Sequence, residues 1–198
     1  MTMKSAKVVS INQRAIENLK YIRDTMERAG SFTAVPGWGG ILMGISALLT
    51  ALVSSRLPTP ESWFAAWLGE AALAMSIGGW AMVQKSKAVE SPLLYGPGKK
   101  FALSLCPAMF AGAVITGVLF QHRLFALMPG LWLLQYGVAV VTGGAFSVRV
   151  VPIMGLSFMT LGGAALLCPF EYANWFMAAG FGFLQIGFGI VIARRHGG

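Results

Sequence analysis

Glu70 is the first candidate for a functional residue in this sequence, because it is an acidic side chain deep inside an apolar run. That run begins at Trp63 and reads WFAAWLGEAALAMSIGGWAM. A helix of about 20 residues crosses the roughly 30 Å hydrocarbon layer of a bilayer. An ionisable group at such depth is costly, so it faces other helices and finds a partner. We therefore expect Glu70 to be protonated, or paired with a polar side chain such as Gln135 or Gln185.

Two glutamines occupy comparable places in later apolar runs. An offset of 65 residues aligns Trp67–Gly79 with Trp132–Gly144 and places Glu70 on Gln135, and the LQYG around Gln135 reappears as LQIG around Gln185. The sequence therefore predicts a candidate intramembrane polar site made of Glu70, Gln135 and Gln185. It has two interpretations: a path for a small solute or ion, or hydrogen bonding that joins helices. The same alignment predicts three repeated two-helix hairpins.

Other catalytic or metal-binding patterns are not recognisable. The two histidines, His122 and His196, are far from any Cys or carboxylate cluster with the spacing of metal ligands. No serine or cysteine has a general base in a known motif, and Glu70 has no second acid within the apolar runs. We expect no metal, no cofactor and no enzymatic activity.

The elements that must position these residues are membrane helices. The chain is 56% hydrophobic and 11% charged, with a mean hydropathy of +0.69, which is far from a soluble composition. Residues 31–198 contain six apolar runs of spanning length. The expected spans are 38–55, 62–84, 101–121, 124–146, 150–168 and 173–193. The predicted fold class is an all-α membrane protein with six transmembrane helices.

The net charge of +8 is explained by topology rather than by nucleic acid. If the N-terminus is cytoplasmic, 13 of the 15 Lys and Arg residues lie in cytoplasmic segments, and only Arg56 and Arg123 lie outside. This asymmetry is typical of the positive-inside rule. We expect both termini to be cytoplasmic and no nucleic acid to be bound.

Lys99 and Lys100 follow two glycines in the sequence YGPGKK, directly before the third run. Lysines and free amides at a helix start can hold an anion. The spacing of a P-loop and its preceding strand are missing. We expect these lysines to contact lipid phosphate at the inner surface of the membrane, which makes membrane lipid a partner.

Residues 1–30 form a separate cytoplasmic segment with an amphipathic helix at 10–30. Ser10 and Gln13 fit a capping box, and Gly30 fits the helix end. An apolar seam with heptad spacing is made of Ala15, Leu19, Ile22 and Met26. Basic and acidic residues are nearly balanced on the other face, which favours a protein partner or a homodimer over anionic lipid. The alternative is that the helix packs on the protein's own inner loops.

The stretch YIRDTMERAGSFTAVPGWGG resembles a pattern of small polytopic bacterial membrane proteins of unassigned function. The resemblance covers about the first 40 residues and implies no activity. We expect the protein to lie in a bacterial inner membrane. The leading hypothesis is a non-enzymatic membrane subunit or regulator that engages a partner through residues 10–30, and the alternative is a transporter or channel for a small solute or ion around Glu70.

Overall fold

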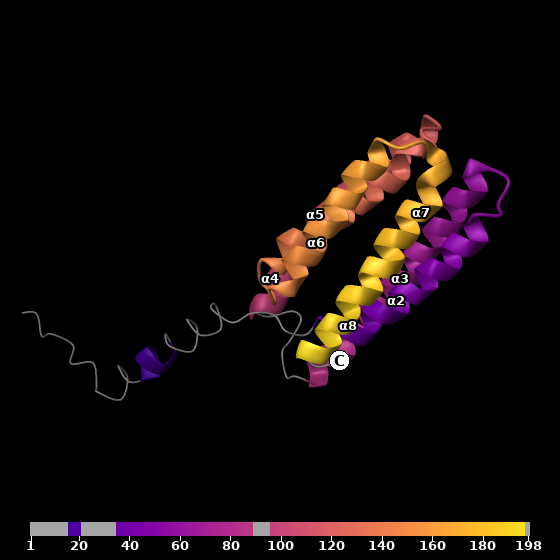
Figure 1. Ribbon diagram of the computed structural model, residues 1–198. Helices are drawn as coiled ribbons and strands as arrows, with labels where there is room; N and C mark the ends of the chain where they lie inside the picture. Colours follow the sequence, from indigo (N-terminus) through magenta and orange to yellow (C-terminus); the bar gives the residue numbers. More distant parts are fainter. Residues whose placement is uncertain (1–15, 21–34, 89–95, 197–198) are drawn as a thin grey trace, which may run out of the picture. The chain divides into compact units, whose positions relative to one another are not determined.

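The computed structural model describes residues 16–20, 35–88 and 96–196, which contain helices and no β-strand (Figure 1). The chain divides into two units, Met1–Gly30 and Ser31–Gly198. In the first unit, residues 16–20 are helical. The remainder of the helix expected at 10–30 lies outside the described residues, so that helix stays a prediction.

The second unit is a bundle of long antiparallel helices. Its first elements are α2 (Gly37–Ser54), α3 (Pro60–Ala88), α4 (Gly96–Gln121), the 3₁₀ helix η1 (Phe125–Leu127), α5 (Met128–Gly144) and α6 (Val150–Leu166). The last helical region consists of the 3₁₀ helix η2 (Phe170–Tyr172), α7 (Ala173–Met177), the π-helix η3 (Ala178–Leu184) and α8 (Gln185–His196).

Helix length and composition support five membrane spans in the described part. Five helical regions are long and apolar enough to cross a membrane, whereas α6 is apolar but has only 17 residues. The predicted span at 150–168 corresponds to this shorter helix. The protein is therefore an all-helical integral membrane protein.

The turn before α3 shows how local sequence sets a helix boundary. The Ser62 amide donates to Thr59 Oγ1 (3.2 Å), and the Thr59 amide donates to Ser62 Oγ (3.3 Å). This is a reciprocal cap in which Ser takes the place of Glu or Gln. Pro60 fits the first helical position, where its missing N–H costs nothing. The cap fixes where α3 starts and therefore the register of Glu70 along it.

Helices α5 and α6 lie side by side and contact each other through glycines (Figure 1). A Cβ added to Gly155 would lie 2.7 Å from the Gly137 carbonyl oxygen, so only glycine permits this approach. The contact runs the length of both helices. A Cβ on Gly144 would lie 2.9 Å from Pro152 Cδ at one end, and a Cβ on Gly130 would lie 2.6 Å from Leu166 Cγ at the other.

Helices α2 and α8 make a second glycine seam. A Cβ on Gly44 would lie 2.5 Å from Ile186 Cγ1 and 2.9 Å from the Gly182 carbonyl oxygen, and a Cβ on Gly189 would lie 2.9 Å from the Gly37 carbonyl oxygen. The Gly40 and Gly44 pair, a weak sequence signal by itself, thus lies where two backbones meet. This seam turns the opposite side of α2 toward α3.

The described helices do not pack as three equal hairpins. Helix α2 packs on α3 and α4 packs on α5, but the main partner of α6 is α5, and the main partner of α8 is α2. The π-helix of the last region has no counterpart in α3 or α5. The threefold repeat therefore stays a prediction from the sequence.

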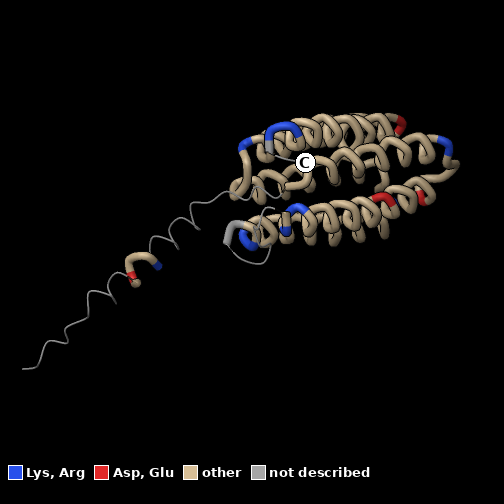
Figure 2. Tube along the Cα trace, turned by 90° about the horizontal axis from the view of Figure 1, so that it is seen from below, with Lys and Arg blue, Asp and Glu red and all other residues tan. Residues whose placement is uncertain are grey.

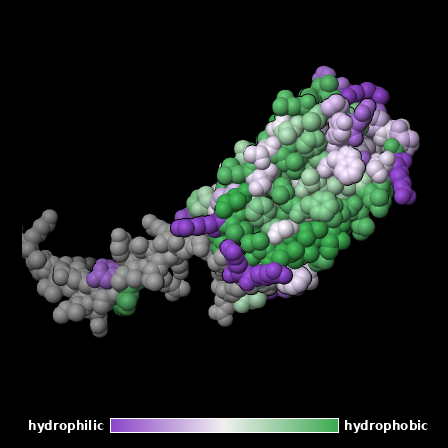
Figure 3. Space-filling view, in the orientation of Figure 1, coloured by the Kyte–Doolittle hydropathy of each residue, from purple (hydrophilic) through white to green (hydrophobic). Residues whose placement is uncertain are grey.

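The face of the bundle seen in Figure 3 is mainly hydrophobic along its length and hydrophilic at its ends. Figure 2 shows Lys and Arg gathered mainly at one end. The alternating helices place there Lys85, Lys87, Lys99, Lys100, Arg149, Arg194 and Arg195, with no acidic residue in the described segments of that end. The opposite end carries Arg56, Glu61, Arg123 and Glu171, which sum to zero charge.

Substituting Gly155 tests the first glycine seam. Gly155→Ala forces α5 and α6 apart, because the new methyl group would overlap the Gly137 carbonyl and Val141. We expect a loss of about 1–3 kcal/mol in the free energy of unfolding, measured by thermal or denaturant unfolding in detergent. Gly163→Ala is the matched control on α6, since its Cβ would meet no atom within 4 Å. Equal losses in the two variants would contradict the seam.

Candidate functional site

The Glu70 side chain lies between α2 and α3 and is bonded to two hydroxyl groups of α2. It is only 7% exposed. Ser46 Oγ lies 2.7 Å from Glu70 Oε1, and Thr50 Oγ1 lies 3.0 Å from Glu70 Oε2. The sequence-based expectation pairs Glu70 with Gln135 or Gln185, but the structure places hydroxyls of the neighbouring helix on it instead.

These hydroxyls belong to a row along one face of α2. Ser46, Thr50 and Ser54 recur every four residues, which places them one above another on a helix. Ser54 Oγ continues the row by donating to Asn174 Oδ1 at 2.7 Å. The row thus joins α2 to α3 at Glu70 and to α7 at Asn174.

Asn174 accepts hydrogen bonds from three helix-borne donors at one oxygen. Besides Ser54, the indole N–H groups of Trp63 and Trp67 donate to Asn174 Oδ1 at 2.8 and 3.2 Å. Both tryptophans are 3% exposed. Trp63 is therefore not a lipid-facing anchor at the membrane boundary, because its ring is buried and stacked on Trp132 with centroids 5.6 Å apart.

Gln135 uses its amide to hold a different helix. Its Nε2 donates to the Ala108 carbonyl oxygen of α4 at 3.0 Å. Two turns further along α5, Thr142 Oγ1 lies 3.0 Å from the Ser104 carbonyl oxygen of α4. The two bonds flank Pro107, which stands inside α4 and cannot donate a backbone hydrogen bond. The arrangement supports α4 where its own hydrogen-bond ladder is interrupted.

Gln185 lies at the junction between the π-helix η3 and α8. It is 5% exposed, and its Oε1 accepts a hydrogen bond from Tyr136 Oη at 3.2 Å. The Tyr136 ring packs against Phe158 and Phe181 with centroids 4.8 and 5.3 Å apart. A π-helix widens the backbone and is frequent at functional sites. Here the π-helix contains Phe181, one of the two rings that pack on Tyr136.

The three predicted polar residues therefore do not share a hydrogen bond. Within the described residues, no bond links any two of Glu70, Gln135 and Gln185, and each is bonded to a different helix. Every fully buried side-chain nitrogen or oxygen in this part of the chain has a partner. Four partner residues were not predicted from the sequence: Ser46, Thr50, Asn174 and Tyr136. The four-residue spacing of hydroxyls in α2 was the available signal.

The remaining predicted residues lie on the surface or outside the description. Leu19 is 66% exposed, whereas Ala15, Ile22 and Met26 lie outside the described residues. Lys99 and Lys100 are exposed near the start of α4, with Lys100 Nζ 5.7 Å from the centre of the Phe146 ring. In residues 16–20, 35–88 and 96–196, no three His, Cys, Asp or Glu side chains are placed to hold a metal ion.

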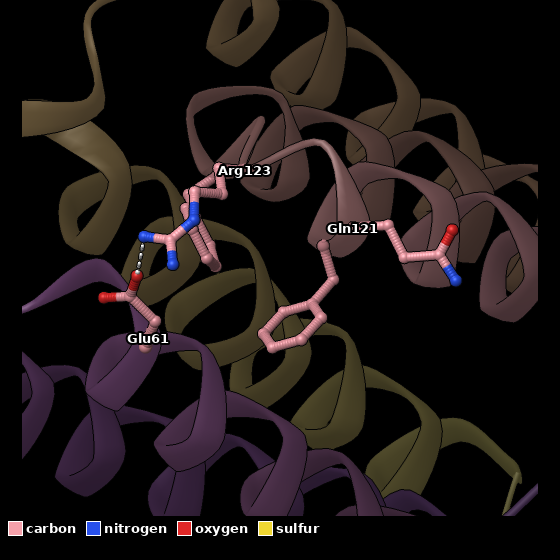
Figure 4. Close-up of a pocket in the computed structure, with 5 residues that line it drawn as sticks. Glu61, Gln121 and Arg123 are labelled. Carbon is pink, nitrogen blue, oxygen red and sulfur yellow. Dashed lines mark hydrogen bonds and ion pairs between the residues drawn. The ribbon is translucent and has the colours of Figure 1, made fainter.

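An ion pair borders a pocket at the end of the bundle opposite the basic one (Figure 4). Arg123 Nη1 donates to Glu61 Oε1 at 3.1 Å, while the Gln121 side chain points away. The pocket has a volume of about 220 Å³, and Phe120 and Phe125 form its apolar wall. Arg123 has a φ of 56°, which is uncommon outside glycine. An exposed ion pair contributes at most about 1 kcal/mol, so it fastens the turn after α4 to α3 only weakly.

No protein-family model matches the chain, and no curated protein and no solved structure shows a significant match.

Removing the shared acceptor tests the Asn174 cluster. Asn174→Leu leaves the indole N–H groups of Trp63 and Trp67 without an acceptor, whereas Ser54 Oγ keeps the Ala51 carbonyl oxygen at 3.3 Å. Each buried donor without an acceptor costs about 1–3 kcal/mol. We expect a clear drop in the midpoint of thermal unfolding and a change in tryptophan fluorescence, because Trp63 and Trp67 lose their partner. Trp175→Phe is the control on α7, since Trp175 is 75% exposed. An unchanged midpoint in Asn174→Leu would contradict a stabilising role.

Proposed function

We propose that the protein is a six-span membrane subunit or regulator without catalytic activity, located in a bacterial inner membrane, which binds a protein partner or a second copy through residues 10–30. Both termini lie in the cytoplasm. The observation that carries the proposal is a pair of large apolar side chains, Ile16 and Leu19, each 66% exposed on a unit separate from the bundle.

The sixth span is supported by the α5–α6 contact. Helix α5 belongs to one of the five spanning regions, and α6 accompanies it from Gly144 to Gly130. A helix of 17 residues is at the short end of the range that can cross a bilayer. A helix held against a spanning partner over that whole length crosses with it.

The orientation is supported by the charges at the bundle ends. The basic end holds seven Lys and Arg residues and no acid in its described segments, whereas the other end is neutral. The positive-inside rule places the basic end in the cytoplasm. Lys99 and Lys100 then face the inner headgroups, where lipid phosphate is available.

The partner surface is supported by the amphipathic pattern of residues 10–30. Ile16 and Leu19 are exposed within the short described helix, and the seam continues in the sequence at Ile22 and Met26. An exposed apolar stripe on a helix is the usual feature for groove or coiled-coil binding. Nearly balanced charge on the other face favours protein over anionic lipid.

Charge placed on the seam tests this proposal. In Leu19→Glu/Ile22→Glu, two carboxylates replace the apolar contacts, so a co-purifying protein or a dimer should be lost while the bundle still inserts. Native mass spectrometry and pull-down composition measure the result. The control, Lys20→Glu, changes charge on an exposed position beside the seam and should keep the partner. If the double variant keeps the same partner and oligomer mass as the wild type, the helix does not bind a partner, which contradicts the proposal.

The second candidate function is transport of a small solute or ion at Glu70. The observation in its favour is the Glu70 carboxyl group, which is 7% exposed within a spanning helix. It lies next to two hydroxyls that can each donate and accept a hydrogen bond. Intramembrane acids with such neighbours occur in proton and ion pathways. The polar site of this second candidate consists of Glu70 and the hydroxyls of α2. Gln135 and Gln185 are not hydrogen-bonded to it.

Flux measurements separate the two candidates. If Glu70 carries an ion, Glu70→Gln removes it with little change in size, so uptake driven by a pH gradient into proteoliposomes should disappear. Thermal stability should stay near the wild-type value, because an amide still accepts a hydrogen bond from Thr50. Wild-type proteoliposomes without flux of any tested ion would exclude transport and leave the partner proposal untouched.

A further inference from the structure

The pocket at the end of the bundle opposite the basic one has a packed aromatic wall (Figure 4). The rings of Phe120 and Phe125 lie edge to face with centroids 5.8 Å apart, and Phe64 of α3 packs on both, at 4.8 and 6.3 Å. The pocket volume is about 220 Å³. Pockets that hold drug-sized molecules measure about 300–1,000 Å³. This pocket therefore has room for a smaller group, of the size of a lipid headgroup.

The ion pair on the rim of this pocket leaves most of its hydrogen-bonding capacity unused. Arg123 Nη1 donates to Glu61 Oε1 at 3.1 Å, and within the described residues neither side chain makes another polar contact. A guanidinium has five N–H groups, and a carboxylate has two oxygens. Both side chains are accessible, with exposed fractions of 79% and 44%. The pair can thus bind an anionic oxygen through Arg123 and an ammonium through Glu61 without separating.

Arg123 occupies the position after α4 where glycine is usual. The Leu124 amide donates to the Leu119 carbonyl oxygen at 2.8 Å and the Arg123 amide to the Phe120 carbonyl oxygen at 3.1 Å, which is the Schellman pattern of a helix end. The pattern needs a left-handed residue, and Arg123 has a φ of 56°. Glycine adopts this conformation freely, whereas a side chain makes it costly. Residues strained in this way cluster at ligand sites, and here the strained residue carries the guanidinium of the pocket.

The charges at this end of the bundle favour a ligand that carries both signs. Arg56, Glu61, Arg123 and Glu171 sum to zero charge, so a ligand with a net negative charge is not attracted here as it is at the basic end. A zwitterion matches the two opposite charges of the rim one by one. The pocket also lies where the spanning helices α3 and α4 begin and end, which is the level of lipid headgroups.

We infer that this pocket binds a zwitterion in which a phosphate and a primary ammonium are joined by two carbons, as in the headgroup of phosphatidylethanolamine. The phosphate oxygens accept hydrogen bonds from Arg123, and the ammonium donates to Glu61. The carbons of the headgroup lie against Phe120 and Phe125. The acyl chains of such a lipid would follow the apolar surfaces of α3 and α4. This site is independent of partner binding through residues 10–30 and of transport at Glu70.

Native mass spectrometry of the full chain with added lipids tests the inference. The wild type should bind dioleoylphosphatidylethanolamine about tenfold more tightly than phosphatidylglycerol or phosphatidylcholine with the same chains. The reason is that the glycerol headgroup lacks the cation and that choline lacks N–H donors. Arg123→Gly should lose this preference, while the midpoint of thermal unfolding stays level or rises, because glycine suits the turn. Arg56→Gly is the matched control, since it removes the same charge from the same end of the bundle but outside the pocket.

A second variant and a soluble ligand complete the test. Glu61→Gln removes the negative charge but keeps an oxygen acceptor, so binding of the ethanolamine lipid should fall toward that of the choline lipid. Glycerophosphoethanolamine carries the same headgroup without acyl chains: if it displaces the lipid, the site serves a soluble ligand, and if it does not, the site serves the membrane lipid. Both outcomes support the zwitterion site. Equal binding of the three lipids by the wild type would overturn the inference, and so would an ethanolamine preference that survives Arg123→Gly.

Discussion

Helix backbones contact each other at glycines along two seams of this bundle, and the positions of the buried polar groups follow from that contact. In a bilayer there is no hydrophobic force between helices, so association depends on close packing and on hydrogen bonds. Gly155 brings α6 against the Gly137 carbonyl, and Gly44 brings α8 against α2. Each seam fixes the rotation of its helices, because only the glycine faces fit together.

Helix α2 shows how one seam positions a polar site. Its glycine face is taken by α8, so the hydroxyl row of Ser46, Thr50 and Ser54 lies toward α3 and α7. There it meets the Glu70 carboxyl and the Asn174 side-chain carbonyl. Since the lipid offers no replacement, each of these groups must be satisfied within the bundle. The described part of the chain meets that requirement for every fully buried side-chain nitrogen and oxygen.

The sequence predicts helices better than it predicts their partners. Long apolar runs indicate membrane helices because the thickness of the bilayer sets their length, and Glu70 attracts attention because acids are rare there. The partners of Glu70 could not be predicted from the sequence, because Ser and Thr are common in apolar helices. Only the packing of α2 on α3 shows that Ser46 and Thr50 face Glu70. The burial of Trp63 cannot be predicted from its residue type, because the acceptor of its indole N–H is Asn174, which lies more than 100 residues away in the chain. The π-helix η3 has no sequence signal at all.

Whether α6 crosses the membrane together with α5 decides the topology of the chain and the side on which residues 10–30 act. Cysteine labelling tests it in a background without native cysteines (Cys106→Ser, Cys168→Ser). Ala145→Cys and Glu171→Cys place an exposed thiol before and after α6. If α6 crosses with α5, a membrane-impermeant maleimide labels Glu171→Cys in intact cells and labels Ala145→Cys only after permeabilisation. Labelling of both thiols from the same side would contradict this crossing.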